Sequence, residues 1–308
     1  MGSNTSRESM KTKMMVSARD EIGTGQKFIA GAAAAISVAT NAAALLSLWV
    51  RGLDLTIHDY LNALVTAYRE LTAPFFEILL LPAISTVARL IHLNIALQPH
   101  AADIFAFLFS YFALFAAVTL RLNHLWRLAL YYVLFGTLSS FLSAAIFGAI
   151  VVQSSFQSIV VPYGFTTGLC IFTFATSLRA AIFFPRKNES RRASFGFYSR
   201  HAWRYLIVGA ITPLMVYPVY AFVSAGEDSS SPLGFGILCT SLLYLFLGFY
   251  RFVLGPWSGN MHSTKGHWLG KRLNSGEGLT GFYLMLVVSI VTLLLLLNVV
   301  YLLVGRSS

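Results

Sequence analysis

The apolar positions of this 308-residue chain gather into long runs separated by short, mostly basic segments. A run of about 20 apolar residues matches the hydrocarbon thickness of a bilayer when it is helical. The sequence therefore predicts an all-α, polytopic bundle in a single transmembrane domain over 28–304, with a polar, basic tail before it (1–27) and a short tail after it (305–308). The expected spans are 28–50, 102–121, 126–152, 158–184, 204–224, 233–254 and 280–304.

The first span contains one strongly polar side chain, Asn41, among many alanines. Small residues allow helix backbones to approach closely in lipid, where van der Waals packing drives association. An amide within such a span is most readily satisfied by another helix. We therefore expect Asn41 to form a hydrogen bond to a neighbouring helix.

Residues 51–101 differ from the rest of the chain and form an expected amphipathic insert. Thr56 and Asp59 have the spacing of a capping box at the start of a helix. Apolar residues then recur three and four positions apart, which is the pattern of a helix with one apolar face. They are Ile57, Leu61, Leu64, Tyr68, Leu71 and Phe75. Pro74 is expected to end this helix.

The stretch 75–97 is apolar and long enough to span, but it contains Glu77, Arg89 and His92. A charged residue near the bilayer centre costs about 2.5–3.5 kcal/mol on insertion scales. We therefore expect a re-entrant or interfacial hairpin, with an eighth span as the alternative. Glu77, Arg89 and His92 are candidates for a functional polar cluster, although snorkelling to the surface is the simpler interpretation.

A short motif occurs twice, at the start of two expected spans. The copies are His124-x-Trp126-Arg127 and His201-x-Trp203-Arg204, where x is any residue. Each is followed by an apolar run, a turn and a second apolar run, which predicts hairpin repeats over 124–184 and 201–254. Tryptophan beside arginine is typical of the aromatic belt at the headgroup level.

Composition and charge support a membrane protein and argue against binding to nucleic acid. Only 11% of the residues are charged, compared with about 25% in soluble domains. The net charge of +10 comes from clusters between the apolar runs, as the positive-inside rule requires. This distribution favours a cytoplasmic N-terminus and contact with anionic inner-leaflet lipid. A bacterial inner membrane and a eukaryotic plasma membrane or endomembrane would both accept these spans.

Few residues suggest chemistry. Cys170 and Cys239 both fall inside expected spans and are expected to be buried, without a disulfide framework. No set of residues has the spacing of a metal site or a catalytic triad, so we expect no metal and no cofactor. Gly2 fits the N-myristoylation pattern, with a chance match as the alternative.

Three functions remain open. The first is a non-enzymatic role in membrane assembly, through packing against lipid, a protein partner or a second copy of the chain. The second is a transporter or channel using the fourth and fifth spans, because broken helices and polar stripes often frame transport sites. Its candidate residues are Thr166, Cys170, Thr173, Ser177, Pro213 and Pro218. The third is a lipid-modifying enzyme using His262, His267 or the polar cluster named above.

Overall fold

The computed structural model describes residues 4–52, 55–90, 100–123, 126–148, 232–253 and 276–305, together with a few isolated positions between 207 and 273. All regular structure in these residues is helical. The elements are α1 (Asn4–Gly52), α2 (Asp59–Phe75), the π-helical segment η1 (Phe76–Leu80), α3 (Leu81–Leu90), α4 (His100–Asn123), α5 (Trp126–Gly148), α8 (Pro232–Val253) and α10 (Gly276–Gly305).

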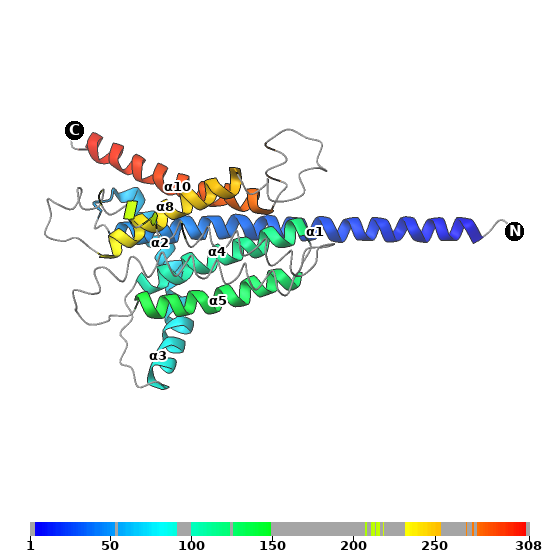
Figure 1. Cartoon of the computed structure of the whole chain (residues 1–308), viewed down its shortest axis with the longest axis horizontal. Helices are drawn as coiled ribbons and strands as arrows, with labels where there is room; N and C mark the ends of the chain where they lie inside the picture. Colours follow the sequence, from blue (N-terminus) through cyan, green and yellow to red (C-terminus); the bar gives the residue numbers. More distant parts are fainter. Residues whose placement is uncertain are drawn as a thin grey trace.

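The long helices lie side by side and alternate in direction (Figure 1). α4 packs between α1 and α5, while α10 packs mainly against α8 and also contacts α1. Contacts between the end of one helix and the start of the next show the antiparallel arrangement of α1 and α4, for example Ser47 with Asp103. Because α1 ends where α4 begins, α2, η1 and α3 must connect them at one end of the bundle.

Four of these helices are long and apolar enough to cross a membrane: Gly25–Arg51, His100–Leu122, Trp126–Ala145 and Gly278–Val304. A shorter apolar helical stretch covers Ile237–Val253. These five segments correspond to the expected spans at 28–50, 102–121, 126–152, 280–304 and 233–254. The apolar helices indicate a membrane protein. The expected spans 158–184 and 204–224 lie outside the described residues apart from isolated positions, so the seven-span count and the repeat stay predictions.

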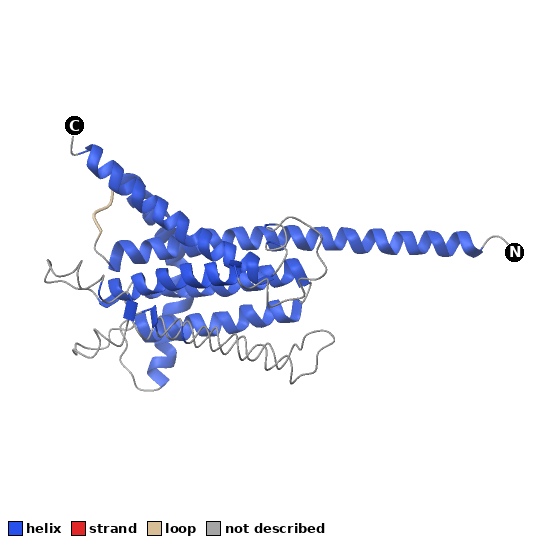
Figure 2. Ribbon diagram, turned by 45° about the horizontal axis from the view of Figure 1, so that its top comes forward, coloured by secondary structure: helices blue, strands red, loops and turns tan. Residues whose placement is uncertain are grey.

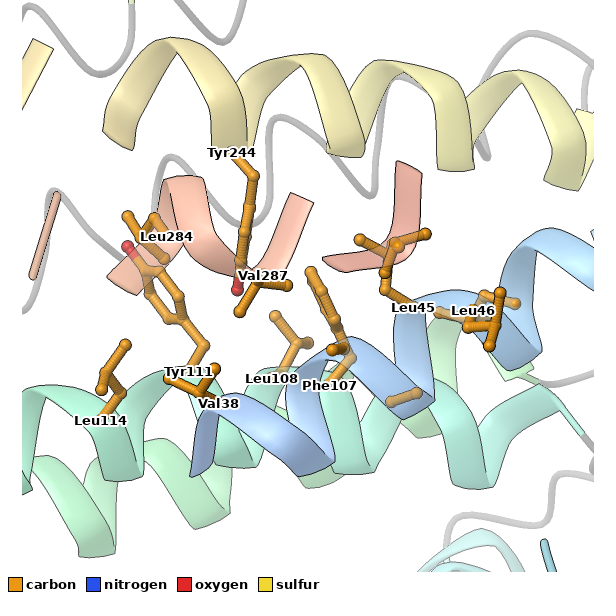
Figure 3. Packing of buried hydrophobic residues seen from close by; sticks show 14 of the residues in the cluster. Val38, Leu45, Leu46, Phe107, Leu108, Tyr111, Leu114, Tyr244, Leu284 and Val287 are labelled. Carbon is orange, nitrogen blue, oxygen red and sulfur yellow. The ribbon is translucent and has the colours of Figure 1, made fainter. Parts of the chain in front are cut away.

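The core lies between α1, α4, α8 and α10. Figure 3 shows Tyr244 reaching from α8 toward the side chains of α4 and α10. Its ring centroid lies 4.8 Å from that of Phe107 and 5.4 Å from that of Tyr111. Aromatic pairs at such distances contribute beyond the area that they bury, about 0.5–1.5 kcal/mol each. This aromatic contact therefore joins α8 to the α1–α4 pair.

The expected hydrogen bond of Asn41 is confirmed. The Asn41 Nδ2 donates to the carbonyl oxygen of Phe107 at 2.8 Å and to the Ser110 hydroxyl at 2.9 Å. Both acceptors belong to α4, so the amide fixes how α1 is rotated and shifted against it. A polar side chain whose donor is bonded to another helix costs less than one facing lipid.

Glycines allow the closest approaches between helices. A Cβ at Gly281 of α10 would lie 2.5 Å from the Gly248 carbonyl oxygen and 2.5 Å from the Phe252 nitrogen, both on α8. A Cβ at Gly136 of α5 would collide with the Phe112 side chain of α4. These contacts leave no room for a methyl group at either position. The backbone of α10 therefore packs directly on the backbone of α8, and the backbone of α5 packs on the Phe112 side chain of α4.

α1 extends well beyond the bundle toward the N-terminus (Figure 1). The sequence predicts only a polar tail for residues 1–27, whereas the helix begins at Asn4. The helix continues without interruption into the first span. The tail prediction therefore missed a helical segment, because a polar sequence gives no apolar period from which to recognise one.

The insert between α1 and α4 contains the expected helix, but two predictions about its ends are wrong. His58 is the N-cap in place of Thr56, and its ring nitrogen Nδ1 accepts a hydrogen bond from the Tyr60 amide at 3.5 Å. Pro74 does not end the helix, since it lies inside α2. Proline removes one backbone donor and crowds the preceding turn. The wider π-helical turn of η1 follows directly and continues the helix into α3.

The predicted hairpin at 75–97 is also not what the structure shows, because residues 76–90 continue as helix. Residues 91–99 lie outside the described part of the chain. Leu61, Val65 and Tyr68 are buried, whereas Leu64, Leu71 and Phe75 of the predicted apolar face are exposed. The apolar side chains of α2 thus extend beyond the strip that the bundle covers.

Candidate functional site

The end of the bundle that carries α2 and α3 brings together several charged and polar side chains. Asp103, at the start of α4, is only 2% exposed, and it accepts a hydrogen bond from the Ser47 hydroxyl at 2.9 Å. The same carboxylate oxygen lies 3.8 Å from Nε of Arg51, at the end of α1. Arg69 of α2 donates from Nε to the Ser47 hydroxyl at 3.1 Å. Ser47 therefore links the carboxylate of α4 to the guanidinium of α2.

This polar cluster (Ser47, Arg51, Tyr68, Arg69 and Asp103) is arranged around a single carboxylate. The Tyr68 hydroxyl is buried near Asp103; burial raises its pKa well above the usual range, and the charge of Asp103 raises it further. Burial lowers the pKa of Arg69, and the charge of Arg51 lowers it further. Tyr68 therefore stays neutral, whereas an arginine keeps its charge in proteins. The cluster then contains two positive charges for one negative charge.

The linker before α2 is attached to α10 by a second set of contacts. The Asn298 side chain accepts a hydrogen bond from the His58 amide at 2.7 Å and donates to the Thr56 carbonyl oxygen at 3.0 Å. The Tyr60 hydroxyl donates to the Leu294 carbonyl oxygen at 2.8 Å. The ring of Tyr301 stacks on His58, with centroids 5.1 Å apart. The entry to α2 is therefore held against the last helix as well as the first.

Replacing Asn298 by leucine is expected to loosen this attachment. The variant leaves the His58 amide and the Thr56 carbonyl without their partners, and each lost hydrogen bond costs about 1–3 kcal/mol when the remaining group stays buried. We expect a lower Tm in detergent and faster amide hydrogen exchange in residues 55–60. Ser289→Ala is the matched control on α10, since its hydroxyl bonds only within the helix, to the Met285 carbonyl. Unchanged exchange in the leucine variant would contradict this role of Asn298.

An exposed apolar surface continues from the outer side of α2 through η1 into α3. Leu71 is 81% exposed, and Ile78 and Leu90 are each 75% exposed. In both views α3 runs crosswise to the long helices and projects from the side of the bundle (Figures 1 and 2). We define Leu71, Phe75, Ile78, Leu79 and Leu90 as the apolar face of the insert.

The sequence-predicted cluster at 75–97 is not assembled in the described residues. Glu77 lies on η1 and Arg89 near the end of α3, both exposed. No ion pair joins these two residues, while His92 lies outside the described residues. Their separation along one helix, about 18 Å at 1.5 Å per residue, explains why they do not meet.

The other predicted residues fall mostly outside the part of the chain that the structure describes. These are Thr166, Cys170, Thr173, Ser177, Pro213, His124, His201, Trp203 and Arg204. Pro218 is an isolated exposed position. Trp126 is exposed at the start of α5, and the Arg127 guanidinium lies 5.7 Å from its ring centroid. Cys239 is buried, as expected.

Nothing in the sequence directly indicated that Asp103 would meet Arg51 and Arg69. An indirect signal was present. An acidic residue at the start of one span lies close to a basic residue at the end of the preceding span when the two helices pack antiparallel. Arg69 could not be placed in the same way, because its partner is a serine hydroxyl rather than a carboxylate.

Within the described segments, no group of three or more His, Cys, Asp or Glu side chains is arranged to hold a metal ion. In comparisons with protein-family models, curated proteins and solved structures, no match to this chain was found.

Proposed function

We propose that the chain is a multi-pass membrane protein with a non-enzymatic role, and that α2, η1 and α3 lie in the bilayer interface and contact lipid. The observation that carries this proposal is the apolar face of the insert on helices that run crosswise to the apolar spans. Exposed apolar patches of this kind mark contact with a membrane or another protein. A helix perpendicular to the spans at one end of a bundle lies in the plane of the membrane surface, where an apolar face can enter the acyl boundary.

The charges of the chain support an orientation for this arrangement. The N-terminal segment contains Arg7, Lys11, Lys13, Arg19 and Lys27. Basic residues next to a span favour the cytoplasmic side and are attracted to its anionic lipids. With the N-terminus in the cytoplasm, the insert lies at the opposite, outer interface. The protein then contacts both membrane surfaces, with basic side chains on the cytoplasmic side and apolar side chains of the insert on the outer side.

Fluorescent labelling tests whether the insert meets lipid. In a chain with Cys170 and Cys239 replaced by alanine, single cysteines at Ile78 and at Leu90 would carry an environment-sensitive dye. Asn62, an exposed polar position on α2, provides the matched control. In vesicles of brominated phosphatidylcholine we expect quenching at Ile78 and Leu90 and little at Asn62, because bromines on the acyl chains quench only dyes at their depth.

The other outcomes of this measurement distinguish exposure to water from cover by protein. Water-like emission and no quenching at both apolar positions would overturn the proposal. A blue-shifted emission without quenching would show that protein, from a partner or a second copy, covers the face. The transporter and lipid-modifying alternatives stay predictions, since the residues that they depend on lie largely outside the described part of the chain.

A further inference from the structure

We propose that Arg51 and Arg69 form a binding site for a phosphate-type anion at the end of the bundle that carries the insert. The site consists of the guanidinium groups of α1 and α2 on either side of the Ser47–Asp103 hydrogen bond. This inference is independent of whether α3 lies in the interface, because it rests on the contacts between α1, α2 and α4.

The charges of the polar cluster are not balanced. Among the described residues, Asp103 provides the only carboxylate within 4.0 Å of either guanidinium, and the contact is to Arg51. Arg69 has a neutral partner, the Ser47 hydroxyl. An isolated charge in a partly buried position is costly unless an opposite charge accompanies it. Counted over the described residues, the polar cluster therefore has one more positive charge than negative charges, which favours an anion.

The Arg69 side chain has an unused donor. A guanidinium has five N–H groups in a planar fork. In Arg69, Nε is used by Ser47, whereas Nη2 is buried and has no hydrogen-bond partner in the described part of the protein. A buried donor without an acceptor is destabilising. An oxygen of a tetrahedral anion would supply that acceptor after a small movement of the side chain.

The polar cluster is accessible to an anion and matches a phosphate chemically. The Arg51 side chain is 30% exposed, so an anion can reach the cluster from the outside of the bundle along this residue. Two guanidiniums suit a phosphate, because its several oxygens accept paired hydrogen bonds from each fork. The cluster lies at the end of the apolar spans, which is the level of lipid headgroups. A free phosphate ion and the phosphate of an anionic lipid share this chemistry.

Thermal stability of the full chain in phosphate-free detergent tests the site. Inorganic phosphate would be titrated in one arm, and phosphatidic acid in mixed micelles in the other, with phosphatidylcholine as the lipid control. We expect Tm to rise with added anion. We expect Arg51→Gln and Arg69→Gln to weaken the apparent affinity about tenfold or more, which corresponds to about 1.4 kcal/mol per factor of ten. Arg89→Gln, an exposed cation on α3, is the matched control and should bind as the unaltered chain does.

The two arms identify the source of the anion. Stabilisation by inorganic phosphate indicates a soluble ion, and stabilisation by phosphatidic acid alone indicates a lipid headgroup. Because Arg69→Gln also removes a hydrogen bond to Ser47, the partly exposed Arg51→Gln variant decides if the other fails to fold. If neither ligand raises Tm, or if Arg51→Gln binds as well as the unaltered chain, the proposal is wrong.

Discussion

Replacing Gly281 by alanine is expected to separate α10 from α8. The new Cβ would lie 2.5 Å from both the Gly248 oxygen and the Phe252 nitrogen. These are backbone atoms, so they cannot rotate aside as a flexible side chain would. Overpacking of this kind costs about 1–3 kcal/mol and sometimes more. Since α8 also contributes Tyr244 to the core, we expect Tm in detergent to fall by roughly 5 °C or more.

Gly31→Ala is the matched control for this prediction. It makes the same change in another apolar helix, where nothing lies within 4 Å of the new Cβ. Alanine is a better helix former than glycine by about 1 kcal/mol, so this variant should be as stable as the parent or slightly more so. Equal Tm values for the two alanine variants would show that α8 and α10 do not approach as the structure has them.

Replacing Asp103 by alanine is the second change with a large expected effect. It leaves the Arg51 guanidinium and the Ser47 hydroxyl without their shared acceptor, whereas Arg69 can still donate to Ser47. Removing the acceptor leaves the buried Ser47 hydroxyl unsatisfied and the partly exposed Arg51 unpaired, which costs about 1–3 kcal/mol. We expect a large fall in Tm and release of α2 from α1 and α4, measured as faster amide exchange over residues 61–72.

Two further variants separate charge from shape at this position. Asp103→Asn keeps an oxygen that can accept from Ser47 but removes the charge. Its Tm should therefore fall between that of the unaltered chain and that of the alanine variant. Asp59→Asn removes an exposed carboxylate in the first turn of α2 and should change Tm little. If alanine at Asp103 leaves α2 as protected as before, the polar cluster is not what holds the insert in place.

Hydropathy was sufficient to predict the long apolar helices that the structure describes, because a long uncharged run has few alternatives to an apolar helix. It also predicted the hydrogen bond of Asn41, since an amide in a span needs a protein partner. It could not predict that Pro74 would be accommodated. That outcome depends on the π-helical turn beside it, which is a cooperative property of the backbone rather than of any one residue.

The candidate site was harder to predict than the spans, for a different reason. Arg51, Arg69 and Asp103 are far apart in sequence, and each looks like an ordinary charge at the edge of a helix. Their contact follows from the antiparallel packing of α1 and α4 and from the way in which α2 folds back over both. Asn298 was missed as well, because an amide near the end of the last span gives no hint that its partners are backbone groups at residues 56 and 58.

Because α1 is unbroken, it fixes the distance between Asn4 and the first apolar span. A helix of 49 residues is about 70 Å long, and the part before Gly25 accounts for about 30 Å of it. That length is close to the thickness of the hydrocarbon core itself. Such a rod transmits rotation and tilt of the first span to its far tip. A molecule bound near Asn4 would then be held at a fixed distance from the membrane. Inserting two glycines near Gly25 would make that distance variable without altering the spans.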